Sequence, residues 1–179
     1  MKKGLFIIVL ILSSLMIEPV HSHASDTIDS REMIELTNAW KIFLKAVSTN
    51  DMKKIRILSV AKIHCRACLD NTAEEAKEME RMERTDPDWY NKLYDDKIYI
   101  PIDTFCKQDY PIIFTKELIS KLRNSKAGYV VSDFNGQKLY EVLITATKPS
   151  VQFPEGALHT FQFVKTNNAY KFWGIDSIP

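Results

Sequence analysis

The dipeptide Asn135-Gly136 lies between two segments rich in strand-forming residues, 129–134 and 138–147. Asn and Gly tolerate the positive φ angles that a type I′ turn requires at both central residues, and this turn suits the twist of two antiparallel strands. In the second segment every other residue is apolar, which indicates one buried face. These alternate residues are Tyr140, Val142, Ile144 and Ala146. The dipeptide therefore predicts an antiparallel hairpin in the last third of the chain.

Other segments extend this sheet. Residues 158–165 and 169–175 flank Asn167-Asn168 and predict a second hairpin, which follows a loop punctuated by Pro and Gly over 149–156. Residues 98–102 are short, apolar and rich in strand formers, although a proline confines them to a sheet edge or a strand end. They are predicted to form the first strand.

The segment before these strands shows helical spacing of apolar residues. Asp29 and Glu32 form a capping pair for a helix over 29–48, and Asp51 caps a second, shorter helix. The two helices are expected to pack as a hairpin. Their predicted buried residues are Leu36, Trp40, Phe43, Leu44 and Val47 in the first helix, and Ile55, Leu58 and Ala61 in the second.

Charged residues dominate 71–84, which predicts an exposed helix, and Asp86-Pro87 predicts the start of another helical turn. Between 103 and 124 the pattern predicts a helix with a kink near Pro111. The stretch from Glu74 to Arg84 mixes both signs of charge at neighbouring helical positions. It is interpreted either as a solvated face or, because it follows a cysteine pair, as a recognition surface.

Helices followed by antiparallel strands are typical of the α+β class. We expect an N-terminal helical hairpin and further helices packed on a curved antiparallel sheet of four to five strands. Residues 1–24 are predicted to be a signal peptide, because Lys2 and Lys3 precede an apolar run that is too short to span a bilayer. Residues 25–179 are then a single domain with a helical insertion at about 65–95.

The order of elements resembles the nuclear transport factor 2-like superfamily, whose cone-shaped domain pairs an N-terminal helical hairpin with a strongly bent sheet. Trp40, Phe43, Ala46 and Asp51, running into Ile55 and Leu58, look like its first two helices. The segments 161–164 and 170–173 look like its last two strands. The resemblance covers about 29–176, and 65–94 departs from it as an insertion. It implies a pocket inside the cone, where enzymes of the superfamily place an Asp or a His.

Export and charge narrow the range of partners. The signal predicts a periplasmic or secreted product with no stable membrane anchoring after cleavage. Without Lys2, Lys3 and Glu18, the 24 basic and 23 acidic residues of the chain become 22 of each. A neutral protein gives no electrostatic reason to expect nucleic acid, whose binding favours an excess of Lys and Arg.

The three cysteines, Cys65, Cys68 and Cys106, admit three readings. A redox pair needs its first Cys at a helix start after a strand, and the predicted elements place no strand before residue 65. A zinc site would just reach its ligand count, but the adjacency of His64 and Cys65 strains their simultaneous coordination, and the ligand spacing fits no familiar zinc finger. We therefore expect a structural disulfide, with the pairing left open, and no metal or cofactor.

Aromatic residues of the sheet are candidates for a ligand pocket: Tyr140, Phe161, Phe163, Tyr170 and Phe172. His159 shares a strand face with Phe161 and is a candidate acid or base. Phe172 and its neighbour Trp173 point to opposite faces, which suggests a homodimer through the sheet.

The sequence therefore predicts an exported, noncatalytic binding domain. Its partner is expected to be a small apolar ligand or an envelope protein, and an inhibitor or immunity role falls within this class. The alternative is an isomerase, dehydratase or hydrolase of small molecules that uses His159 in the pocket.

Overall fold

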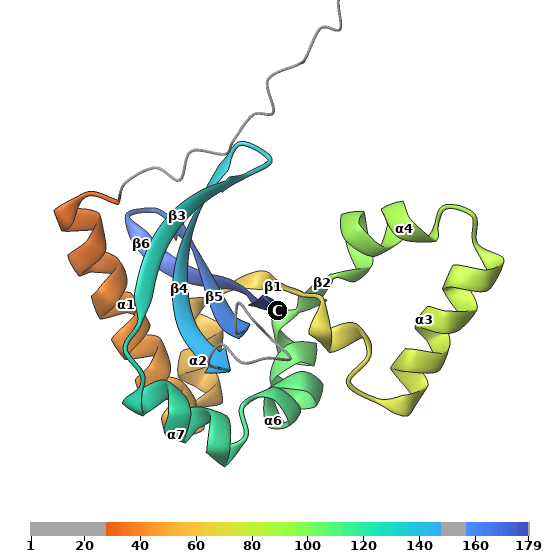
Figure 1. Ribbon diagram of the computed structural model, residues 1–179, viewed down its shortest axis with the longest axis horizontal. Helices are drawn as coiled ribbons and strands as arrows, with labels where there is room; N and C mark the ends of the chain where they lie inside the picture. Colours follow the sequence, from red (N-terminus) through yellow and green to blue (C-terminus); the bar gives the residue numbers. More distant parts are fainter. Residues whose placement is uncertain (1–27, 148–156, 179) are drawn as a thin grey trace, which may run out of the picture.

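The computed structural model describes residues 28–147 and 157–178. The predicted signal peptide and the whole loop predicted over 149–156 lie outside the described residues. Within them the protein is an α+β fold in which helices pack on a six-stranded sheet (Figure 1). The predicted fold class is therefore confirmed.

The sheet has the strand order β2-β1-β6-β5-β4-β3. Its strands are β1 (Ser59–Cys65), β2 (Tyr99–Pro101), β3 (Gly128–Phe134), β4 (Gln137–Thr147), β5 (Ala157–Thr166) and β6 (Ala169–Ile178). All neighbours are antiparallel except β1 and β6, which run parallel. The sheet is thus larger than the four to five strands expected, and it is mixed rather than purely antiparallel.

The helical elements share two locations, the body beside the sheet and a projecting arm (Figure 1). The body contains α1 (Ser30–Ser48), α2 (Met52–Leu58), α5 (Ile102–Thr104), the π-helical turn η3 (Phe105–Asp109), α6 (Tyr110–Ile113) and α7 (Lys116–Asn124). The arm contains the 3-10 turn η1 (Ala67–Leu69), α3 (Ala73–Thr85), α4 (Trp89–Lys92) and the π-helical turn η2 (Leu93–Lys97). We call residues 66–98 the arm. The arm leaves the sheet after β1 and returns at β2.

Side-chain caps fix where the first two helices begin. One carboxylate oxygen of Asp29 accepts the N–H groups of Arg31 and Glu32, each at 2.8 Å, and Asp51 accepts that of Lys54 at 2.9 Å. Glu32 does not complete a capping box; its carboxylate instead accepts the hydroxyl of Tyr140 at 2.7 Å. The predicted helix starts are confirmed, while Glu32 ties α1 to the sheet.

The second helix ends earlier than its apolar spacing predicts. α2 stops at Leu58, and the chain is a strand from Ser59 onward, where the Ser59 hydroxyl donates to the carbonyl of Ile55 at 2.7 Å. Ala61 is exposed on β1, so its assignment to the buried side of a helix was wrong. A short apolar run does not by itself distinguish a helix from a strand, and here the pairing of β1 with β6 favours the strand.

Both turns predicted from Asn and Gly have the backbone that they require. Asn135 and Gly136 have φ angles of 54° and 77°, and Asn167 and Asn168 have φ angles of 49° and 60°. Positive φ at both central residues matches the type I′ hairpin. The β3–β4 and β5–β6 hairpins therefore form as predicted.

Phe172 and Trp173 face opposite sides of the sheet, as their adjacency predicts. Phe172 lies in the core beneath the helices, whereas Trp173 belongs to a second, smaller cluster on the other face, with Leu139 and Val164. Trp173 is only 8 % exposed, and the His64 ring stacks on it at 4.6 Å between ring centroids. The outward face of β6 is thus covered largely by residues of the chain itself. The homodimer through the sheet stays a prediction.

Candidate functional site

The five predicted pocket residues lie in the main core. Tyr140, Phe161, Phe163, Tyr170 and Phe172 are all buried. Rings from α1 and the segment before α7 fill the space around them: Trp40 lies 4.9 Å from Phe161, Phe43 lies 4.4 Å from Phe172, and Phe114 lies 6.2 Å from Phe161, measured between ring centroids. These contacts account for the aromatic residues of the sheet as core packing.

His159 is half-buried on β5. Burial lowers the pKa of its imidazole, and the Lys121 ammonium lowers the pKa further. The role of His159 as an acid or base stays a prediction.

The cysteines resolve into one disulfide and one thiol. Cys65 bonds to Cys68, with 5.3 Å between their Cα atoms, and Cys106 is a buried free thiol. Contrary to the sequence-based expectation, a strand does precede the pair, because Cys65 ends β1 and Cys68 lies in the turn η1. Both bonded cysteines are buried, and the bridge links the end of the sheet to the start of the arm.

Alkylation of the unfolded protein provides a test of this pairing. Without a reductant we expect one alkyl group per molecule, on Cys106, and with a reductant we expect three. Mass spectrometry of the intact protein and of its peptides reads out both numbers. Two or more alkylated cysteines in the unreduced sample would contradict the disulfide.

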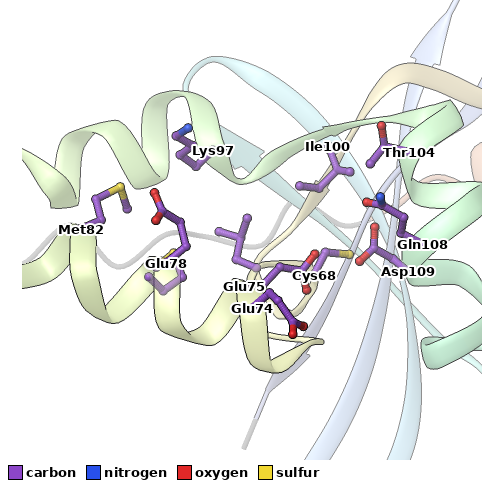
Figure 2. A pocket seen from close by; sticks show the side chains of 12 residues that line it. Cys68, Glu74, Glu75, Glu78, Met82, Lys97, Ile100, Thr104, Gln108 and Asp109 are labelled. Atoms are coloured by element: carbon purple, nitrogen blue, oxygen red, sulfur yellow. The ribbon is translucent and has the colours of Figure 1, made fainter.

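A cleft lies between the arm and the body, and side chains from both line it (Figure 2). Its volume is about 360 Å³. The arm contributes Cys68, Leu69, Glu74, Glu75, Glu78, Met79, Met82 and Lys97, and the body contributes Ile100, Thr104, Gln108 and Asp109. A volume of this size lies at the lower end of the range for ligand pockets, about 300–1,000 Å³.

The start of α3 sets which of its side chains reach the cleft. The Thr72 hydroxyl accepts the N–H of Glu75 at 3.2 Å, and the Glu75 carboxylate accepts the N–H of Thr72 at 2.9 Å, which completes a capping box. From this fixed start, residues three and four positions apart share one face. Glu75, Glu78, Met79 and Met82 therefore line the same wall, as Figure 2 shows for the labelled members of the group.

Asp109 faces this wall from the body. Its residue is only 2 % exposed, and the Asn71 amide donates to one of its carboxylate oxygens at 2.9 Å. Burial raises the pKa of the Asp109 carboxyl; the Asn71 hydrogen bond lowers this pKa, and the charge of Glu75 raises it. Within the described residues, no ion pair joins Asp109 to a cationic side chain.

Asparagine in place of Asp109 is expected to change how stability depends on pH. A carboxyl whose pKa is raised by folding contributes stability below its unfolded pKa of about 3.9, and this contribution is lost as the pH rises through the folded value. Asp109→Asn should therefore raise the free energy of unfolding at pH 7 and leave it nearly unchanged at pH 3.

Urea unfolding at several pH values measures this effect, and Asp95→Asn at an exposed position of the arm is the control. The same difference between Asp109→Asn and wild type at pH 3 and pH 7 would contradict the raised pKa.

Further observations bear on what the cleft can hold. Among the described residues there is no group of three or more His, Cys, Asp or Glu side chains arranged to bind a metal ion.

No helix in the described ranges is long and apolar enough to cross a membrane.

The sequence pointed to only part of this site. The charged run from Glu74 to Arg84, beside the cysteine pair, was one of its candidate recognition surfaces, and it supplies one wall of the cleft. Ile100, Gln108 and Asp109 were not anticipated, because they reach the cleft through the return of the chain from arm to body. No advance signal marked Asp109, which directly follows the polar residues Lys107 and Gln108.

No known family, curated protein or solved structure matches the chain.

Proposed function

We propose that the chain is an exported binding domain, without a reaction of its own, that holds a partner protein at the cleft between α3 and the body. The observation that carries this proposal is the composition of the cleft. The cleft lining combines the apolar side chains of Met79, Met82 and Ile100 with a buried carboxylate. Met79 and Ile100 are half-buried and Met82 is buried. The carboxylate is that of Asp109, which has no cationic partner in the described chain. Apolar surface next to fixed polar groups is typical of binding sites.

The surroundings of the cleft favour a protein over a small ligand. A second hollow continues along α3 and shares Glu78, Met82 and Lys97 with the cleft. The adjoining α4 and η2 carry Tyr90 and Tyr94, which are 59 % and 42 % exposed and lie 4.7 Å apart between ring centroids. Tyr and Met are enriched in protein interfaces. Because the aromatic residues of the sheet are buried in the core, the arm is better supported as a binding surface than the sheet.

Site-specific photo-crosslinking in the cells that encode the protein tests this proposal. A benzophenone side chain at position 79, inside the cleft, is expected to give a discrete protein adduct. The same group at position 83, on the same helix outside the cleft lining, should not give it. Mass spectrometry of the adduct identifies the partner.

The purified partner then permits a quantitative test. Met79→Lys should weaken its binding at least tenfold, because a hydrated ammonium would replace an apolar contact, whereas Glu83→Gln should bind as wild type does. Equal adducts at positions 79 and 83, or unchanged binding by Met79→Lys, would contradict a partner site in the cleft.

A further inference from the structure

The carboxylates of the cleft differ in what balances their charge. Glu78 pairs with Arg81, with 2.6 Å between Oε1 and the guanidinium, and Arg81 lowers its pKa. Glu75 accepts the backbone N–H of Thr72 at the helix start. Asp109 is the most buried of the group, and its hydrogen bond from another side chain comes from the neutral amide of Asn71.

A buried carboxylate without a cation is unfavourable. An ionised group that leaves water loses hydration that hydrogen bonds from neutral groups do not fully replace. A cation placed against Asp109 would restore the balance, and the apolar walls of Met79 and Ile100 would strengthen the attraction by excluding water. The cleft lining adds to this preference, since it holds four carboxylates against the single ammonium of Lys97.

The form of the cleft decides which kind of cation fits. Hard divalent ions take about six to eight oxygen ligands. Although four carboxylates line the cleft, no three His, Cys, Asp or Glu side chains of the described residues are grouped so that they could hold one metal ion. A lysine or arginine side chain needs a different site, with an apolar channel for its alkyl stem and a carboxylate for its head. Met79, Met82 and Ile100 of the cleft lining provide the apolar wall, and Asp109 provides the carboxylate. Figure 2 labels Met82, Ile100 and Asp109 among the side chains around the cleft.

We propose that the cleft binds a lysine or arginine side chain of the partner protein, with its cationic head against Asp109 and its stem along Met79 and Met82. This inference rests on the proposed function, and it names the chemistry by which that partner is recognised. The volume of about 360 Å³ admits one such side chain together with an apolar neighbour.

A titration with two matched peptides tests the inference. The probes are acetyl-Leu-Lys-Leu-amide and the same peptide with norleucine in place of lysine, which keeps the alkyl stem and removes the charge. The purified protein carries ¹³C at its methionine methyl groups, so Met79 and Met82 report on the cleft and Met33, on α1, serves as an internal control. The lysine peptide is expected to shift the cleft methyls and to bind at least tenfold more tightly than the norleucine peptide.

Variants separate charge from folding. Asp109→Asn should bind the lysine peptide at least tenfold more weakly, although its stability at pH 7 is expected to rise, and Glu83→Gln should bind as wild type does. Equal affinity for both peptides would overturn the cationic anchor while leaving an apolar partner site in place. Equal affinity for the peptide and for free butylammonium would assign the site to a small amine and overturn the protein side chain. The absence of shifts with any probe would overturn the inference, while the crosslinking experiment still decides the proposed function by itself.

Discussion

Replacing Phe43 with alanine is expected to lower the free energy of unfolding by about 3–5 kcal/mol, the usual cost of removing a buried Phe side chain. Phe43 is fully buried on α1, where it stacks on Phe172 at 4.4 Å and meets Phe163 edge-on at 5.8 Å between ring centroids. The substitution would leave a cavity between the helices and the sheet. For a domain with a total stability of about 5–15 kcal/mol, this loss is a large fraction.

Urea unfolding followed by tryptophan fluorescence measures the change. The matched control is Ile34→Ala on the same helix, at a side chain that is 63 % exposed, and it should change the stability by less than about 0.5 kcal/mol. A small effect of Phe43→Ala would mean that the helices do not pack on the sheet as described.

Alanine in place of Gly174 is expected to cost about 3 kcal/mol, at the upper end of the range for overpacking. Gly174 lies on β6 opposite His64 of β1, where the two strands run parallel. A Cβ atom there would lie 2.6 Å from the carbonyl oxygen of His64 and 3.0 Å from Oε1 of Gln162. The first of these is a backbone atom, so β1 and β6 would have to separate.

Gly128→Ala is the control for this prediction. A Cβ atom at Gly128 would meet that of Leu143 at 3.6 Å, which is an ordinary contact, so the stability should change by less than about 0.5 kcal/mol. Thermal or urea unfolding of both variants compares them directly. If Gly174→Ala were as stable as wild type, the parallel pairing of β1 with β6 would be in doubt.

Local signals in the sequence were sufficient for the hairpins and the helix starts. Asn135-Gly136 and Asn167-Asn168 predict turns because few residues accept positive φ at two consecutive positions. Asp29 and Asp51 predict helix starts because their carboxylates reach free N–H groups nearby in the chain. Each of these features depends on neighbours within four residues.

The parallel strand pair and the cleft could not be predicted in this way. The start of β1, up to Ala61, was assigned to the preceding helix because its partner, β6, lies more than a hundred residues further along the chain. The aromatic residues of the sheet were interpreted as the lining of a pocket. A sequence does not show that a helix such as α1 fills the space beside them, as Phe43 does beside Phe172. Cys68, Met82 and Asp109 line one cleft only because the arm lies against the body, and local sequence patterns do not show that arrangement.

The ionisation of Asp109, followed by ¹³C NMR of its side-chain carboxyl during a pH titration, tests the proposed site most directly. In the free protein the pKa should lie above the ordinary value, because the carboxyl is buried without a cation. Saturation with acetyl-Leu-Lys-Leu-amide should lower this pKa, since a bound cation favours the ionised form, and the norleucine peptide should not lower it. An Asp109 pKa that is ordinary in the free protein and unchanged by the lysine peptide would contradict the account.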